Sequence, residues 1–121
     1  MAKTILVVED FDDVRDAMSI IIELLGYDVV LATDGHEAVA QAKKHLPGLI
    51  FMDIAMPVFD GIAATREIRS IAELAGVPIL AVTAHGQHYR EEALAAGCTE
   101  VIDKPLVFED IGKVIGRYFN D

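Results

Sequence analysis

Short blocks of apolar residues recur along the chain, with more polar segments between them. The blocks occupy residues 5–8, 29–32, 49–52, 79–82 and 101–102. Within each block apolar side chains follow one another without alternation, which is typical of strands buried on both faces of a parallel sheet. The pattern therefore predicts five parallel strands.

The segments between the blocks carry apolar residues at helical spacing. In the first segment this stripe consists of Val14, Ala17, Met18, Ile21, Leu24 and Leu25. We expect Asp12 or Asp13 to be the N-cap of the first helix and Gly26 to end it. The second helix should open at Asp34 and end before Pro47, because the residue preceding a proline disfavours helical geometry.

Three further helices are predicted in the second half of the chain. One runs from about Asp60 to Ile71, the next covers residues 87–96 and ends at Gly97, and the last contains Ile111 and Ile115. Strands that alternate with helices define an α/β doubly wound fold, with helices on both faces of the sheet. We expect one domain over residues 1–121. The strand order 2-1-3-4-5 is natural at this length, although the pattern alone leaves a second order open.

Polar residues directly follow several of the predicted strands. Glu9 and Asp10 follow the first strand, Asp53 the third, Thr83 the fourth and Lys104 the fifth. In an open α/β sheet, ligands bind outside the carboxyl ends of the strands, near the point where the strand order reverses. We therefore expect three carboxylates to converge on one crevice, with a hydroxyl and an ammonium group across from them.

Three carboxylates within a few ångströms repel one another unless some are protonated or a cation lies among them. An all-oxygen ligand set selects a hard cation such as Mg²⁺, which usually acts together with phosphate. The Lys104 ammonium suits an anion that arrives after the metal. The set predicts a phosphoryl-transfer site in which Asp53 is the nucleophile and forms an acyl phosphate.

Taken singly, most of these residues have ordinary structural interpretations. An isolated acidic pair such as Glu9 and Asp10 is more often a solvated strand end or a helix cap. Thr83 alone would be a helix cap and Lys104 a surface lysine. Asp53 fits such an interpretation poorly, because an unpaired aspartate that closes an apolar strand is costly to bury. The functional interpretation rests on the combination: separate strand ends each supply a group that phosphoryl transfer requires.

Composition and charge narrow the class of function. The 121 residues include 20 acidic and 10 basic ones, a formal net charge of −10, which argues against sequence-independent nucleic-acid binding. A hydrophobic content of 53% argues against disorder, and the apolar runs are far shorter than a membrane span. The N-terminus lacks the apolar core of a secretory signal, so we expect a cytoplasmic protein. The single cysteine, Cys98, can form no intrachain disulfide and no cysteine-type zinc site by itself.

Four motifs stand at the strand ends. They are Ile-Leu-Val-Val-Glu-Asp at 5–10, Phe-Met-Asp-Ile-Ala-Met-Pro-Val-Phe-Asp-Gly at 51–61, Val-Thr-Ala at 82–84 and Asp-Lys-Pro at 103–105. Together and in this order they resemble the receiver domain of two-component response regulators, the family of the chemotaxis response regulator. The resemblance spans essentially the whole chain. It implies a parallel sheet of order 2-1-3-4-5 and transfer of a phosphoryl group from a phosphohistidine to an aspartate.

The resemblance also implies roles for individual residues. Asp53 resembles the phosphoacceptor. Asp10 and Asp53 would bind Mg²⁺ through their side chains, Ala55 through its backbone carbonyl, and Glu9 through metal-bound water; Mn²⁺ is an alternative metal. Thr83 resembles the hydroxyl that turns inward to bond the phosphoryl group.

The loops around the site are assigned in the same way. Lys104 resembles the ammonium that pairs with the phosphoryl group, and in the family the peptide bond corresponding to Lys104–Pro105 is typically cis. Pro57 and the Asp60-Gly61 pair fit the loop after the third strand. Gly61 would permit a close turn there and Asp60 would cap the third helix.

Three positions bear on how the switch is tuned. The family often has an aromatic residue three positions before the lysine, where this chain has Val101. The positions two beyond the phosphoacceptor and two beyond the threonine set the phosphoryl lifetime in the family; here they are Ala55 and His85. Ala55 offers no side-chain group to orient a water, whereas His85 does, although an exposed histidine is more often simply solvated.

The resemblance implies a signalling module that catalyses only its own phosphorylation and dephosphorylation. Its phosphodonor would be a sensor histidine kinase or a histidine phosphotransfer protein. Its output would be a protein partner bound by the face of the fourth helix, fifth strand and fifth helix, and we expect neither nucleic acid nor a membrane as partner. Only residues 119–121 follow the fifth helix, so we expect no output domain in this chain. A stand-alone regulator, a phosphorelay intermediate, a piece of a longer protein and a homodimer all stay open.

Two other classes of protein compete with this interpretation. A Mg²⁺-dependent phosphatase of the haloacid-dehalogenase type would carry Asp-x-Asp after its first strand and a cap insertion, whereas this chain has the adjacent pair Glu9-Asp10 and the lone Asp53. A flavodoxin-like cofactor binder would have a first loop rich in Gly, Ser and Thr, whereas residues 9–13 are acidic. Turnover assays test the phosphatase hypothesis. Flavin that stays bound to the purified protein would support the hypothesis of a flavodoxin-like cofactor binder.

Overall fold

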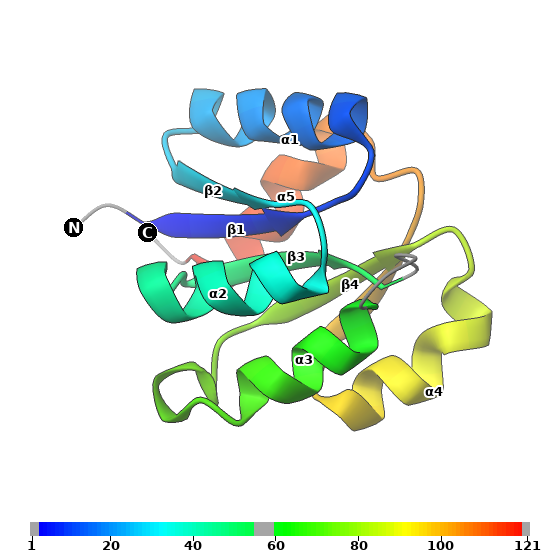
Figure 1. Cartoon of the computed structure of the whole chain (residues 1–121). Coiled ribbons are helices and arrows are strands. Elements are labelled where there is room, and N and C mark those ends of the chain that lie inside the picture. Colours follow the sequence, from blue (N-terminus) through cyan, green and yellow to red (C-terminus); the bar gives the residue numbers. More distant parts are fainter. Residues whose placement is uncertain (1–2, 55–59, 120–121) are drawn as a thin grey trace.

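The strands form one parallel sheet with the order β2-β1-β3-β4-β5 in a computed structural model of the chain (Figure 1). The structure describes residues 3–54 and 60–119, so Ala55 and Pro57 lie outside the described residues. The strand bounds are Thr4–Val8 for β1, Asp28–Ala32 for β2, Leu49–Asp53 for β3, Ile79–Thr83 for β4 and Glu100–Asp103 for β5. The predicted doubly wound α/β class and strand order are confirmed.

Helices cover both faces of the sheet. Their bounds are Asp12–Leu24 for α1, Gly35–His45 for α2, Gly61–Arg69 for α3, Gly86–Ala96 for α4 and Phe108–Tyr118 for α5, with a short 3-10 helix, η1, at Ala72–Leu74. Figure 1 shows α1 and α5 on one side of the sheet and α2, α3 and α4 on the other. No helix in the described part of the chain is long and apolar enough to cross a membrane.

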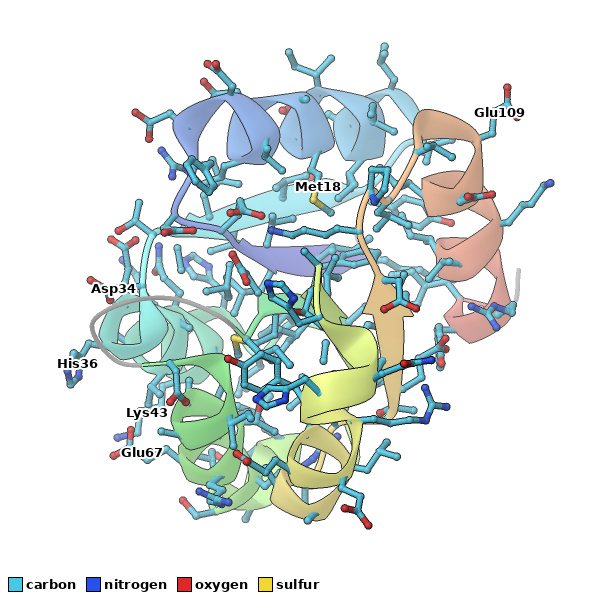
Figure 2. All side chains as sticks on the ribbon, turned by 90° about the vertical axis from the view of Figure 1, so that its right-hand side faces the viewer. Met18, Asp34, His36, Lys43, Glu67 and Glu109 are labelled. Atoms are coloured by element: carbon cyan, nitrogen blue, oxygen red, sulfur yellow. The ribbon has the colours of Figure 1, made fainter. Side chains whose placement is uncertain are left out.

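The strand side chains alternate between two apolar clusters. Ile5 and Val7 of β1 pack with residues of α1 and α5, whereas Leu6 and Val8 pack with residues of α2, α3 and α4. Every residue of β3 and β4 is buried, as expected for strands covered on both faces. The edge strands β2 and β5 are only partly buried, so the apolar blocks are covered on both sides only at the centre of the sheet. In Figure 2, Met18 points from α1 toward the sheet while Glu109 points outward.

Local capping determines several helix ends. The side chains of Asp34 and Asp60 each accept a hydrogen bond of 2.8 Å from the backbone N–H three residues later, which satisfies a donor in the first turn of α2 and α3. At the C-terminal end of α4, the cap residue Gly97 has a φ of 117°, a left-handed conformation that favours glycine. These caps agree with the predicted boundaries.

Two predictions about helix boundaries were wrong. The N-cap of α1 is Phe11, which forms no side-chain capping bond, and Asp12 and Asp13 lie in the first turn instead. Negative charge is favourable there because of the helix dipole. The third helix ends at Arg69 and does not include Ile71, since the N–H of Ile71 bonds to the carbonyl three residues before it and the chain tightens toward η1.

Candidate functional site

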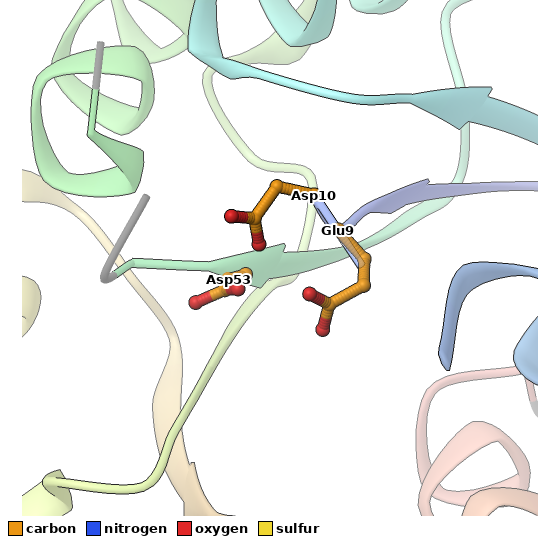
Figure 3. Close-up of side chains that lie close together, drawn as sticks. All are labelled: Glu9, Asp10 and Asp53. Carbon is orange, nitrogen blue, oxygen red and sulfur yellow. The ribbon is translucent and has the colours of Figure 1, made fainter. Parts of the chain in front are cut away.

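The register of β1 and β3 brings three acidic side chains together. Val8 lies beside Met52 in the paired strands, so Glu9 and Asp10 leave the sheet next to Asp53, the last residue of β3. One carboxylate oxygen from each of the three lies within 4.8 Å of the others (Figure 3). The structure thus joins the three carboxylates that the sequence placed at one crevice.

Lys104, in the loop after β5, partners two of these buried carboxylates. Glu9 is 3% exposed and Asp53 is 5% exposed, and burial of an unpartnered carboxylate is costly. The Lys104 Nζ atom lies 3.0 Å from Glu9 Oε1 and 3.4 Å from Asp53 Oδ2. One half-buried ammonium therefore bridges residues that follow the first and third strands.

The site holds an excess of negative charge that affects its ionisation. Burial raises the pKa of Glu9 to about 7, and the charge of Asp53 raises it too, although the hydrogen bonds from Lys104 and from the Phe11 N–H act in the opposite direction. Burial by itself would lower the pKa of Lys104, but the hydrogen bond to Glu9 and the charge of Asp53 more than offset this and raise it. Lys104 therefore stays protonated at neutral pH and offsets part of the negative charge of Glu9 and Asp53.

Arg15 of α1 stabilises the turn that carries the acidic pair, and sequence reasoning missed it. Its Nη1 atom donates a 2.9 Å hydrogen bond to the backbone carbonyl of Glu9, and its Nη2 atom pairs with Asp12. The Phe11 N–H donates to Glu9 Oε2 at 3.2 Å, so the turn is also bonded to the carboxylate itself. The sequence signal that could have predicted this contact is an arginine in the first turn of the helix that follows an acidic strand end.

Thr83, the last residue of β4, is fully buried beside the end of β5. Its Oγ1 atom accepts a 3.1 Å hydrogen bond from the backbone N–H of His85, and its carbonyl accepts a 2.8 Å bond from the backbone N–H of Lys104. The Lys104–Pro105 peptide bond is cis, the isomer that the family resemblance implied. The His85 side chain is exposed and makes no capping bond to α4.

A contact between β5 and α4 was not anticipated from the sequence. The carboxylate of Asp103 lies so close to Gly86, the first residue of α4, that a Cβ at Gly86 would come within 1.9 Å of Asp103 Oδ1. A negative charge at this end of a helix is favourable. The residue before Lys104 therefore contacts the start of the helix that follows Thr83.

Gly61, the first residue of α3, lies close to the backbone at the end of β3. A Cβ at this position would lie 2.4 Å from the backbone oxygen of Asp53 and 2.6 Å from the Cα atom of Ile54. The close approach of α3 to the end of β3 excludes a side chain at this position, while part of the loop expected to turn here lies outside the described residues. The packing of α3 thereby supports the backbone that carries Asp53.

Val101 lies in β5, away from the acidic cluster. It is partly buried and packs against the apolar cluster on the face covered by α2, α3 and α4. Tyr89 of α4 packs against the same cluster. An aromatic ring on α4 thus packs against the same apolar cluster as Val101.

Comparisons with known proteins agree with this arrangement. The profile of the response regulator receiver domain family matches residues 5–116, and the chain belongs to this family. The polar-differentiation response regulator DivK of Brucella ovis is 33% identical over 122 residues, covering 100% of this chain and 99% of that protein.

Solved structures show the same fold. The chemotaxis protein CheY4 of Vibrio cholerae superposes with a TM-score of 0.93 at 30% identity, covering 98% of this chain and 100% of that one. The receiver domain of a sensor histidine kinase from Pseudomonas aeruginosa PAO1 superposes with a TM-score of 0.89 at 36% identity, covering 98% of each chain. That protein was crystallised with a magnesium ion coordinated in its active-site cleft. The chain is therefore a receiver domain of two-component signalling.

Proposed function

We propose that Asp53 accepts a phosphoryl group from the phosphohistidine of a sensor histidine kinase or a histidine phosphotransfer protein, in a Mg²⁺-dependent reaction. The observation that carries this proposal is the buried Asp53 carboxylate, which lies within 4.8 Å of two other carboxylates and 3.4 Å from the Lys104 ammonium. A carboxylate held beside an ammonium group and other candidate metal ligands is suited to nucleophilic attack on phosphorus.

In the proposed step, a carboxylate oxygen of Asp53 attacks the phosphorus atom of the donor. The bond between phosphorus and the imidazole nitrogen breaks, and its electron pair stays on the nitrogen. The products are an acyl phosphate on Asp53 and an unmodified histidine. Lys104 would neutralise charge on the phosphoryl oxygens, and the Thr83 hydroxyl would leave the His85 N–H and donate to one of them. Attack of water on the same phosphorus would return the free carboxylate.

The acidic cluster fits a divalent cation. Its oxygen-only donors are those that Mg²⁺ prefers, and the raised pKa of Glu9 reflects burial and negative charge that a dication would offset. Asp10 and Asp53 would hold the metal through their side chains and Glu9 through a bound water, while the Ala55 carbonyl lies outside the described residues. Bound Mg²⁺ would neutralise charge on the transferred phosphoryl group; Mn²⁺ suits the same donors.

Phosphorylation would be read out by a protein partner in the cytoplasm. Thr83 and Lys104 stand at the ends of β4 and β5, so movement of both toward a phosphorylated Asp53 would displace the start of α4. The face formed by α4, β5 and α5 would therefore change and bind the partner. The exposed His85 beside Thr83 is the candidate residue for tuning the phosphoryl lifetime.

Intact-mass measurement after incubation with acetyl phosphate and Mg²⁺ tests this function. The wild-type protein should gain one phosphoryl group, and chelation of Mg²⁺ with EDTA should prevent it. Asp53→Asn should gain none. Asp60→Asn is the matched control, because it removes one carboxylate from the same region while asparagine still caps α3. Equal phosphorylation of wild type and Asp53→Asn would refute the proposal.

A further inference from the structure

A cavity of about 550 Å³ opens between α1 and the chain that follows β5. Its walls include Val14, Ala17 and Ile21 of α1, and Leu106 and Ile111 from the β5–α5 side. Cavities of roughly 300–1,000 Å³ are the usual size for small-molecule sites, which are mostly apolar with a few polar groups. The cavity therefore has the dimensions and lining of a ligand site, and we call it the α1 chamber.

The chamber walls leave apolar side chains exposed to solvent. Val14 is 41% exposed and Ala17 is exposed, although both belong to the apolar stripe of α1. Met18, the residue after Ala17, is buried and forms part of the lining. Figure 2 shows its side chain pointing from α1 toward the sheet. Covering exposed apolar surface with an apolar group is favourable in water, so the chamber favours a ligand with an apolar body.

The polar groups of the chamber determine the charge that its ligand should carry. Among the described residues, Lys104 is the only cation in the lining. It is already bonded to Glu9 and Asp53, so an anion would have to compete with two carboxylates. Asp13 also lines the chamber and is exposed. Among the described residues, none forms a hydrogen bond or ion pair with its carboxylate. Within the described part of the chain, the chamber thus offers a carboxylate without a partner beside apolar walls.

We propose that the α1 chamber binds a small hydrophobic amine, with its apolar body against α1 and Leu106 and its ammonium group paired with Asp13. Charge complementarity selects a cationic head group over a neutral or anionic one. Asp53 and Lys104 line the same chamber, so an occupant would lie next to the site of the reaction proposed above. Binding itself does not depend on that reaction.

Titration with phenylbutylamine, followed by amide chemical shifts in two-dimensional NMR at saturating Mg²⁺, tests the proposal. The metal keeps the amine from binding to the acidic cluster. We expect saturable shifts centred on Val14, Ile21 and Leu106. Phenylbutanol should bind several-fold more weakly and phenylbutyrate more weakly still. Shifts that do not saturate, or that lie away from the chamber, would overturn the proposal, and phenylbutyrate binding as tightly as the amine would overturn its charge assignment.

Variants separate the chamber from the rest of the surface. Ala17→Leu should fill the chamber and weaken amine binding at least about tenfold, whereas Ala40→Leu on the exposed surface of α2 should not change it. Val14→Leu fills the chamber from the neighbouring turn and serves if Ala17→Leu does not fold.

Asp13→Asn should weaken binding of the amine but not of the alcohol, while Asp16→Asn, outside the chamber on α1, should change neither. Unchanged amine affinity in a folded chamber-filling variant would refute the site. Phosphorylation is not a readout, so failure here is distinct from failure of the proposed function.

Discussion

The ammonium group of Lys104 lies 3.0 Å from the Oε1 atom of Glu9, a residue 95 positions earlier in the chain. Glu9 is also part of the carboxylate cluster that fits Mg²⁺. Lys104 would therefore repel a metal ion that bound to the same carboxylates. On the proposed Mg²⁺ site, a protein cation and the metal would compete electrostatically for the same carboxylates.

Lys104→Met should increase the affinity for Mg²⁺ about tenfold, because the variant removes the repulsion between an ammonium and a dication a few ångströms apart. The same variant should be phosphorylated more slowly, since it lacks the charge that would pair with the phosphoryl group. Isothermal titration with MgCl₂ measures the first effect. Lys113→Met, an exposed lysine of α5, loses the same charge far from the cluster and should bind Mg²⁺ like the wild type. Weaker Mg²⁺ binding by Lys104→Met would contradict the competition.

The stability of the metal-free protein should depend on pH through Glu9. Its pKa is raised in the folded protein to about 7 from an ordinary 4.5, so the folded state binds this proton more tightly than the unfolded state. The associated contribution to the free energy of unfolding is fully present below about pH 4.5 and is lost as the pH rises through 7. One unit of pKa is about 1.4 kcal/mol, so the loss should amount to a few kcal/mol.

Urea denaturation in EDTA at several pH values between these limits measures this effect. Glu9→Gln cannot ionise at this position, so its free energy of unfolding should fall less than that of the wild type as the pH rises. Saturating Mg²⁺ should restore stability to the wild type at neutral pH, because the metal offsets the charge of the buried carboxylate. Parallel pH dependence of the wild type and Glu9→Gln in EDTA would show that Glu9 does not titrate as described.

Asp10→Asn should lose Mg²⁺ affinity while the fold persists or becomes more stable. The variant removes one of three crowded carboxylates, which relieves repulsion in the metal-free protein but deletes a metal ligand. Mg²⁺ titration and thermal unfolding in EDTA give the two readouts. Asp16→Asn, exposed on α1, is the control for loss of one negative charge. A folded Asp10→Asn protein with unchanged Mg²⁺ affinity would rule out this ligand assignment.

Activation should move the loop after Thr83 more than it moves Val101. The Thr83 hydroxyl must leave the His85 N–H to reach a phosphoryl group, and the contact between Asp103 and Gly86 links the start of α4 to the strand that precedes Lys104. Valine is β-branched and stiff at its first torsion, so Val101 has no large ring to reorient. Beryllofluoride with Mg²⁺, a phosphoryl mimic, should cause large amide shifts over residues 83–87 and modest ones at Val101. Large shifts at Val101 with a quiet loop would contradict this.

The features that were predicted from the sequence are those that local pattern encodes. Apolar blocks and their polar ends place Asp53 beside Glu9 as soon as the strand order is known, and Asp34 and Asp60 act as caps wherever their helices lie. The N-cap of α1 was mispredicted because the Phe11 N–H bonds to the Glu9 side chain, an interaction that depends on how the turn folds. Arg15 reaches the Glu9 carbonyl by a similar route.

Contacts between distant elements were beyond sequence reasoning. The approach of Asp103 to Gly86 and the α1 chamber both depend on how distant elements pack against one another. The spacing of apolar and polar residues along the sequence does not predict that packing. The sequence predicted a close turn at Gly61, but the atoms of Asp53 and Ile54 that exclude a side chain there depend on how α3 packs against the end of β3. Adjacent strand ends can be read from a pattern, whereas side-chain packing across the sheet cannot.

The central claim, that Asp53 carries the phosphoryl group, is tested most directly by chemical trapping. Sodium borohydride reduces an aspartyl phosphate to homoserine, so a phosphorylated sample treated in this way and digested should contain homoserine at position 53 by tandem mass spectrometry. The conversion should require Mg²⁺ during phosphorylation and should be absent when acetyl phosphate is omitted. Phosphate found instead on His36, His45, His85 or His88, with aspartate unreduced at position 53, would contradict the account and replace it with a histidine phosphotransfer function.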